Sequence, residues 1–384
     1  MTTRRMPIGL RSRGCSVWLR ARPRVTHRRG VARGFTLIEM MIAMLLGLIV
    51  IAGVISVFLA SQQSYRSNNA LADVEDGSRV AFELMARDIR QAGLTGCNSV
   101  NGRVVNVLNT APGNAKAPST PTAQTWWTDW GNAVHGYGPN SSDGPDPALV
   151  GLSAAQVAGT DSLQLIGAGD SDVTIQSSVP GVNFKLNTPT TQLQTGDVIM
   201  VCSPDHAAIL QISSYNSSNE TVVYNTGAKV SPGNCSSNLA YPNTACSGNS
   251  TDSCMTPSDC FPPPNSIVAQ LTASDWYIGT NPDGGRSLYR VSLQNAGGTM
   301  KATSQEMVRN VTDMHITYLD PSDGAIGNQF VPAATITTDN GWAGVTAVHV
   351  ALTLQSTFQR ASVNGNKPIV RTYAFTTTLR NRVP

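Results

Sequence analysis

Glu39 is the single charged residue in a long apolar stretch, and this position limits what its carboxylate can do. The stretch runs from Phe35 to Ala60 and contains no other Asp, Glu, Lys or Arg. An unpaired carboxylate in such a setting is costly, by about 3 kcal/mol at the centre of a bilayer. This cost indicates that Glu39 has a function and a partner.

Cysteine residues supply the second kind of chemistry. One of the seven, Cys15, lies in an arginine-rich N-terminal leader. An even number in the rest of the chain predicts up to three disulfides, with 15 possible pairings. A metal site is the alternative, but the last four cysteines lack the Cys-x-x-Cys spacing that zinc sites favour. The disulfide candidates are Cys97, Cys202, Cys235, Cys246, Cys254 and Cys260.

No residue pattern indicates an active site. Ser203, Asp205 and His206 are neighbours in sequence, but a catalytic triad is defined by its geometry and needs no such adjacency. The chain has no glycine-rich phosphate loop after a strand, no serine elbow and no His-Glu-x-x-His pair. We therefore expect no enzymatic activity, no cofactor and no metal ion.

The element that positions Glu39 is a predicted membrane-spanning helix over residues 35–60. It exceeds the roughly 20 apolar residues that a bilayer requires. The leader before it, residues 1–34, holds ten arginines and no Asp, Glu or Lys, which places it on the cytoplasmic side. Without these arginines the chain has 17 basic and 24 acidic residues, a charge of about −7. This acidic balance argues against general nucleic-acid binding.

The junction between leader and helix resembles the class III signal of type IV pilins and of type II secretion pseudopilins. The resemblance rests on the run Gly34-Phe35-Thr36-Leu37-Ile38-Glu39. It implies that a prepilin peptidase cuts after Gly34, that Phe35 becomes an N-methylated N-terminus, and that Glu39 pairs with a neighbouring subunit's N-terminal amine. Major pilins often have a proline near the twenty-second mature residue, where this chain has Ser56.

The helical pattern continues beyond the membrane segment, over residues 61–93. No proline lies between Pro23 and Pro112, so one continuous helix from Phe35 to Gln91 is expected. Gly93 and Gly96 provide its end. The predicted apolar stripe is Leu71, Val74, Ala81, Met85, Ile89 and Ala92. The predicted exposed charges, at i, i+4 spacing, are Glu75, Arg79, Glu83 and Arg87.

The segment from Arg79 to Cys97 narrows the resemblance. Its run Arg87-Asp88-Ile89-Arg90-Gln91-Ala92-Gly93 is similar to the close of the helix in PilW-type minor pilins, and J-type minor pseudopilins share part of this pattern. The C-terminal stretch from Leu379 to Pro384 also looks like PilW-type proteins. The resemblance implies an α+β fold, in which a long N-terminal pilin helix packs on a β-rich antiparallel globular domain.

The remaining sequence, residues 94–384, predicts this domain. Short strands are expected from period-two alternation at Leu163, Val198 to Val201, Ile209 to Tyr215, Glu220 to Tyr224 and further on. Turns are expected at residues 216–219 and 281–285. Residues 231–265 hold four cysteines and few large apolar residues, so cross-links are expected to order this loop. The cluster of Trp126, Trp127 and Trp130 is either a contact surface or a cap on the core.

Two classes of function follow. The first is a minor pilin that helps initiate type IV pilus assembly and is incorporated near the tip, with a type II secretion pseudopilin as its rival. The second is a tip module for adhesion or DNA uptake. The resemblance implies the prepilin peptidase, other minor and major pilins, the inner-membrane assembly platform and the lipid bilayer as partners. It implies an inner-membrane location with the C-terminal domain in the periplasm, and then the cell surface.

Overall fold

The structure of the chain is a computed structural model. It describes residues 34–97, 103–139, 142, 144–227, 229–241, 246, 260–324, 327–362, 367–380 and 382. Contacts divide the chain into two compact units, Met1–Ala60 and Ser61–Pro384. The second unit is called the outer unit below.

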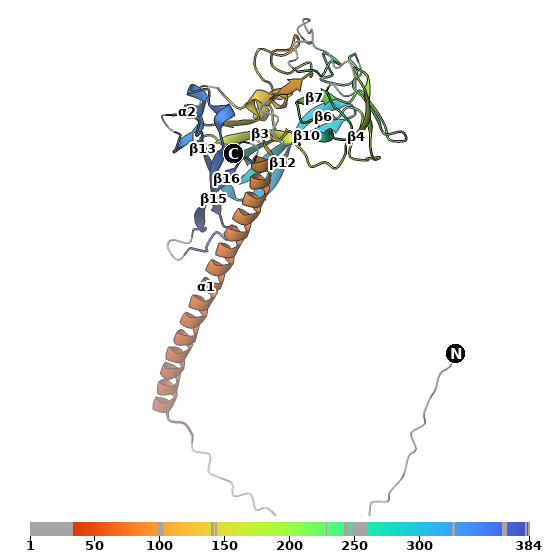
Figure 1. The fold of residues 1–384 in the computed structure, drawn as a ribbon. Coiled ribbons are helices and arrows are strands. Elements are labelled where there is room, and N and C mark those ends of the chain that lie inside the picture. The colour runs from red at the N-terminus through yellow and green to blue at the C-terminus, as the bar shows by residue number, and fades with distance from the viewer. Residues whose placement is uncertain are drawn as a thin grey trace, which may run out of the picture. The chain divides into compact units, whose positions relative to one another are not determined.

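One long helix, α1 (Leu37–Gln91), forms the N-terminal part of the described chain (Figure 1). It begins two residues later than the sequence predicted because Thr36 serves as the residue that precedes the first turn. It ends as predicted at Gln91, and Gly93 just after it adopts a φ of 72° that glycine tolerates without strain. Among the described residues, α1 is the helix long and apolar enough to cross a membrane.

The largest sheet of the outer unit has eight strands and is built around β10 (Ile267–Thr280). The first residues of β10 pair with β6, its middle pairs with β3, and its last residues pair with β11, all antiparallel. A short parallel pair, β1 with β7, departs from the expected antiparallel plan. The other strands of this sheet are β1 (Val104–Asn106), β2 (Val134–Tyr137), β3 (Ser162–Ala168), β6 (Val198–Cys202), β7 (Ala207–Gln211), β11 (Arg286–Ala296) and β12 (Thr299–Arg309).

Two four-stranded sheets make up the rest of the β structure in the described residues. The first has the order β14-β13-β15-β16 and the second β4-β5-β9-β8. The members of the first are β13 (Val311–Leu319), β14 (Phe330–Pro332), β15 (Ala347–Gln355) and β16 (Val370–Thr378). The members of the second are β4 (Ile175–Val179), β5 (Asn183–Leu186), β8 (Ser214–Asn216) and β9 (Thr221–Val223). A short helix, α2 (Ala333–Thr338), follows β14.

These sheets confirm the predicted α+β fold and both predicted turns, since β8 pairs with β9 and β10 pairs with β11. The single strand predicted from Ile209 to Tyr215 is wrong. The chain leaves the large sheet after Gln211 and joins the small sheet at Ser214. Between them, the Ile212 N–H donates to the carbonyl of Asp197, which precedes β6 of the large sheet. The Ser213 N–H donates to the carbonyl of Val223 in β9 of the small sheet.

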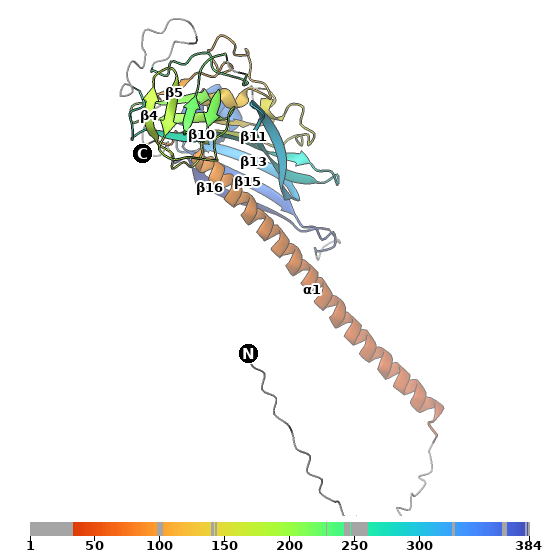
Figure 2. The ribbon, with the colours of Figure 1, turned by 90° about the vertical axis from the view of Figure 1, so that its right-hand side faces the viewer.

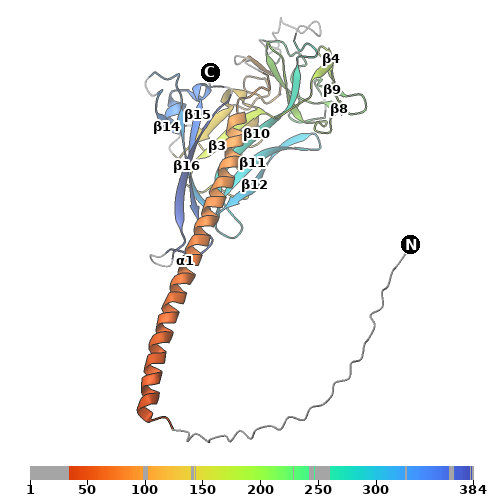
Figure 3. The same cartoon turned by 60° about the horizontal axis from the view of Figure 1, so that its bottom comes forward.

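Three buried clusters lie in the described part of the outer unit. The first joins the C-terminal part of α1 to the β10 to β16 region, and Figure 3 shows this part of α1 between β16 on one side and β11 and β12 on the other. Figure 2 shows the same region from a second direction. The second cluster contains Trp126 and Trp127, and the third lies under the β4-β5-β9-β8 sheet. Burial of apolar surface in these clusters provides the main driving force for folding.

Candidate assembly site

Glu39 and Thr36 form a capping box at the start of α1. The Thr36 backbone N–H and hydroxyl each donate to Glu39 Oε2 at 3.0 Å, and the Glu39 N–H donates to Thr36 Oγ1 at 3.3 Å. This reciprocal arrangement satisfies donors that a helix start leaves open. Gly34, Phe35 and Glu39 are all exposed in the single chain. The Glu39 carboxylate therefore has a local partner and remains accessible to a second group.

The apolar part of α1 has no protein covering within the described residues. Its eighteen-residue most apolar window is 0% buried, and side chains such as Leu48, Val50 and Phe58 are more than half exposed. The helix is unbroken at Ser56, whose hydroxyl donates to the Gly53 carbonyl at 2.7 Å. An exposed apolar surface of this length requires lipid or other apolar helices around it.

The C-terminal part of α1 buries the predicted stripe with one exception. Val74, Ala81, Met85 and Ile89 are at most 2% exposed, whereas Leu71 is only half-buried and Ala70 takes the buried position. The four predicted surface charges are exposed. Arg79 pairs with Glu83 of the same helix at 3.4 Å. Arg87 lies 3.9 Å from Asp170 of the β-rich domain.

Asp88 fixes α1 to the large sheet, a role that the sequence did not indicate. The Trp276 Nε1–H of β10 donates to Asp88 Oδ2 at 3.0 Å, and Arg290 Nη2 of β11 donates to Oδ1 at 3.2 Å. Arg290 Nε also lies 2.8 Å from Oδ2, with side-chain exposures of 33% for Arg290 and 10% for Asp88. A largely buried, charge-assisted contact of this kind fixes orientation as well as adding stability.

The two stretches similar to PilW-type proteins meet at the end of α1. The Gly93 N–H donates to the Ile166 carbonyl of β3 at 2.8 Å, and a Cβ at Gly93 would lie 3.6 Å from Arg382 Nε. Arg382 in turn donates to the Trp342 and Val345 carbonyls at 2.6 and 3.2 Å. Gly167 completes the junction, since a Cβ there would lie 2.2 Å from the Gln91 carbonyl oxygen.

The expectation of disulfide bonds is confirmed. Cys97, just after α1, is bonded to Cys202 at the end of β6, with the Cα atoms 5.8 Å apart. Cys235 is bonded to Cys246, with the Cα atoms 5.4 Å apart. Cys260 is also disulfide-bonded, and Cys254 lies outside the described residues.

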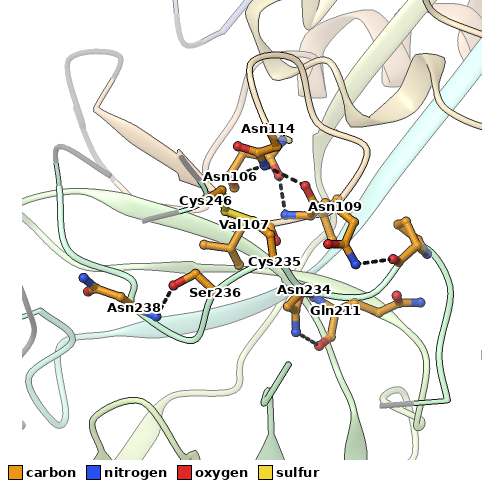
Figure 4. The surroundings of a disulfide bond; sticks show 12 residues. Asn106, Val107, Asn109, Asn114, Gln211, Asn234, Cys235, Ser236, Asn238 and Cys246 are labelled. Carbon is orange, nitrogen blue, oxygen red and sulfur yellow. Dashed lines mark hydrogen bonds between the residues drawn. A yellow bond between two sulfur atoms is a disulfide. The ribbon is translucent and has the colours of Figure 1, made fainter. Parts of the chain in front are cut away.

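Asparagine side chains order the chain around the Cys235–Cys246 bond (Figure 4). The Asn234 amide exchanges two hydrogen bonds with the Gln211 backbone, at 2.7 and 2.8 Å, and Asn109 donates to the Pro232 carbonyl at 2.7 Å. Leu239 and Phe261 are buried in the third cluster. Cross-links were expected to order residues 231–265, and in the described part hydrogen bonds and apolar burial contribute as well.

The tryptophan cluster belongs mainly to the core. Trp126 and Trp127 are each 1% exposed within the second buried cluster, and Trp130 is half-buried against it. Side chains at this depth cannot present a contact surface. The core interpretation of these residues is therefore the one that the structure supports.

Ser203, Asp205 and His206 do not form a triad. His206 Nδ1 lies 3.0 Å from Asp205 Oδ2, but Nε2 lies 2.8 Å from the Leu239 carbonyl. The Ser203 hydroxyl donates to the His206 backbone carbonyl rather than to the imidazole ring. The Nε2 atom that a triad serine would need is thus engaged with a backbone carbonyl, and the imidazole does not activate Ser203.

A buried carboxyl pair, Asp146 and Asp275, lies in the core beside β3 and β10. Asp146 accepts from Gln164 at 2.6 Å and from the Ser162 hydroxyl, and Asp275 is 0% exposed. Burial raises the pKa of Asp275 well above its ordinary value, and the Asp146 charge raises it further. Burial also raises the pKa of Asp146. We infer that Asp275 is the protonated partner that donates to Asp146, because two charges could not both be buried there.

Comparisons with known proteins agree with these features. Residues 29–55, which include Gly34, Phe35 and Glu39, match the family described as the prokaryotic N-terminal methylation motif. Residues 275–381, from the end of β10 to the C-terminal stretch, match the type IV pilus-assembly protein W family. No curated protein matches the chain. Together the two matches support a PilW-type minor pilin of a type IV pilus.

Proposed function

We propose that this protein helps initiate assembly of the type IV pilus and is incorporated near its tip, without enzymatic activity. The observation that carries the proposal is the accessible Glu39 carboxylate at the start of an uncovered apolar helix. Such a helix end is suited to recruit a second subunit whose own N-terminal amine has no partner in the bilayer. The specific partners are then other minor and major pilins and the inner-membrane assembly platform.

Processing would create the matching positive charge. Residues 1–34 act as the leader, the prepilin peptidase cuts between Gly34 and Phe35, and Phe35 carries the methylated amine. Within one chain Glu39 bonds to Thr36 instead. A neighbouring helix that packs alongside with an axial offset brings its amine to Glu39, and burying the two charges together avoids the penalty of burying either one.

The proposed topology follows from the charge pattern. The ten arginines of residues 1–34 hold the leader in the cytoplasm, residues 35–60 span the inner membrane, and residues 61–93 carry the domain of residues 94–384 into the periplasm. Disulfides in this domain agree with an oxidising compartment.

The size of the outer unit favours an end position. It comprises Ser61–Pro384, and its described residues form three sheets. In a fibre packed through helices, a subunit at the end lacks neighbours on one side, so a large domain is accommodated there more readily than in the shaft.

Deletion of the gene tests the proposal. Loss of surface pili, restored by the wild-type gene, is the expected result. Normal piliation with lost attachment or DNA uptake would instead indicate a binding module at the tip. Normal piliation with lost protein secretion would indicate a type II secretion pseudopilin.

A further inference from the structure

Strand β16 forms one edge of the β14-β13-β15-β16 sheet, and in the described residues no strand pairs with its outer side. The Ser356 N–H, just after β15, donates to the Ile369 carbonyl at 2.8 Å. The Leu379 N–H donates to the Thr346 carbonyl at 2.8 Å. Residues that bond to one neighbour alternate along an antiparallel strand, so those between them direct their N–H and C=O groups outward. The outward residues of β16 are Val370, Thr372, Ala374, Thr376 and Thr378.

This edge is open to an added strand. All five outward residues are exposed and uncharged. Within the described residues, the Val370 carbonyl is the one outward backbone group that has a partner, the Arg371 side chain at 3.0 Å. On the other face of the sheet, Phe375 packs against Phe82 of α1, with ring centroids 4.3 Å apart. The helix therefore covers one face of β16, and the other outward backbone groups can bond to a new neighbour.

β16 also lacks the features that usually protect an edge strand from pairing with another chain. Those features are short length, charged side chains, proline and β-bulges. β16 has nine residues and pairs with β15 without a register shift, and residues 372–378 contain no charged residue, glycine or proline. The other long edge strand of the described chain, β12, carries Lys301, Glu306 and Arg309. The remaining edge strands have five residues or fewer.

The direction of β16 argues against a second copy of this chain as the occupant of the edge. Phe375 lies beside Phe82, and Arg382, further along the chain, lies beside Gly93 after the end of α1. β16 therefore runs in the same direction as this part of α1. Two β16 edges related by a two-fold axis pair antiparallel, which sets these parts of the two helices in opposite directions. Pilin helices that assemble side by side run in one direction, so we expect a different subunit.

Charge defines the partner strand further. Arg371 near the start of β16 and Arg380 just after its end are exposed, and neither forms an ion pair within the described residues. Residues 356–384 contain no Asp or Glu. The acidic Glu75 of α1 lies near Tyr373, on the side of the strand that faces the helix. A strand with an uncharged middle and carboxylates near both ends therefore complements the edge.

We propose that the open edge of β16 accepts an extended strand from a different pilin subunit, uncharged in its middle and acidic near its ends. The pairing rests on the proposed function, because it requires other pilins assembled beside this one. Main-chain hydrogen bonds provide the affinity, and the outward side chains select the residues of the added strand. The four-stranded sheet is thereby continued into a neighbouring subunit.

Photo-crosslinking in cells that make the full-length protein tests the contact. A benzophenone amino acid replaces Thr378, an exposed residue at the end of β16, and crosslinked residues are identified by mass spectrometry. The control is the same replacement at Lys301, an exposed residue of β12. We expect position 378 to link to a β-strand of another pilin subunit and position 301 to give few links. A link from position 378 to a second copy of this protein, or to no pilin subunit, would overturn the proposal.

Ala374→Pro tests the backbone pairing, because it removes an outward N–H and leaves the bonds to β15 in place. The matched control is Ala302→Pro. The Met300 N–H donates away from β11, to the Ser231 carbonyl at 3.1 Å, so Ala302 also directs its N–H to the open side of β12. The yield of the position 378 link should fall at least about ten-fold in Ala374→Pro and stay unchanged in the control. An unchanged yield in Ala374→Pro that still unfolds cooperatively in urea would refute strand pairing.

Charge reversal tests the acidic ends of the partner strand. It changes no backbone group, so it also decides the question if Ala374→Pro does not fold. The double change R371E and R380E should lower the yield of the position 378 link about ten-fold, because like charges then face each other. The control double K116E and K185E makes the same change in charge at exposed sites elsewhere. Equal yields in the two double variants would overturn the acidic-ended partner.

Gene deletion separates this contact from the proposed function. If deletion abolishes pili but position 378 links to no pilin, the strand pairing is wrong and the assembly role stands. If deletion leaves pili intact while position 378 links to a pilin strand, the assembly role is wrong and the pairing stands.

Discussion

Glu39 caps its own helix, and the proposed function gives its exposed carboxylate a second role in pairing with another subunit. The capping box requires only a hydrogen-bond acceptor at Oε2, whereas pairing with an amine requires a negative charge. These two requirements can be separated by substitution.

We predict that Glu39→Gln retains the capping box but fails in assembly to the same extent as Glu39→Ala. A broken buried ion pair costs about 3–5 kcal/mol, so incorporation into pili should fall at least about ten-fold. Co-purification with other minor pilins and counts of surface pili measure this incorporation. Thr36→Ala is the control that disrupts capping and keeps the charge. If Glu39→Gln assembled normally, capping rather than charge would be the function of Glu39.

Asp275 gives the outer unit a predicted pH dependence. Its pKa in the folded state is raised above the ordinary value of 3.8, so the folded protein retains a proton that the unfolded chain releases. The free energy of unfolding should therefore fall as pH rises from about 4 through the raised pKa. Asp275→Asn, which can donate to Asp146 at any pH, should stabilise the protein by about 1–3 kcal/mol at neutral pH.

Urea unfolding at pH 5 and pH 8 measures this effect. The variant should gain more over the wild type at pH 8 than at pH 5. The control is Asp172→Asn, a substitution on the surface. It should change the free energy of unfolding by no more than about 0.5 kcal/mol at either pH. Parallel pH dependence in wild type and Asp275→Asn would show that Asp275 keeps its charge throughout.

At the level of elements, α1 is attached to the β structure by an apolar stripe and by the Asp88 contact. The bonds from Trp276 and Arg290 add directional contacts to the apolar packing of the stripe. Asp88 thus couples α1 to the large sheet of the β-rich domain.

Asp88→Asn should loosen this attachment. Arg290 would lose its counter-charge, at a cost of about 1–3 kcal/mol given its partial exposure. Hydrogen exchange should rise in residues 74–91 while the β4-β5-β9-β8 sheet stays protected. The control Glu83→Gln alters an exposed pair, for which a change below about 1 kcal/mol is expected. Unchanged exchange in Asp88→Asn would show that the apolar stripe alone holds α1.

At the scale of the whole molecule, the Cys97–Cys202 bond joins the end of α1 to the centre of the large sheet. It closes a segment of 105 residues, compared with 11 for Cys235–Cys246. Closing a longer loop removes more entropy from the unfolded chain.

Replacing Cys97 and Cys202 together by serine should therefore destabilise the protein more than replacing Cys235 and Cys246. The expected costs are about 4–5 and about 2–3 kcal/mol. Chemical unfolding under non-reducing conditions measures both. The reverse order of the two costs would show that local packing, rather than loop closure, decides the contribution of each bond.

The sequence by itself determined features that depend on neighbouring residues. Helix periodicity is local, so the sequence specifies α1 through three features. These are the apolar run, the charges at i, i+4 spacing, and the glycine just after the helix. Alternation specified β13 and β15, which present one face to the core and one to water. The number of cysteines indicated disulfides, and the Gly34 to Glu39 run indicated a pilin.

Only the tertiary structure decided which distant residues meet. The polar edge strand β12 has no strong alternation, and its pairing with β11 holds it in place. Cys97 is bonded to Cys202, 105 positions away, and Asp88 accepts from Arg290, 202 positions away. Asp275 lies beside Asp146, which is also distant in sequence. Residue type alone does not specify any of these partners. Their contacts arise because α1, β3 and β10 pack together, and packing is set by the combined burial of many side chains rather than by any one segment.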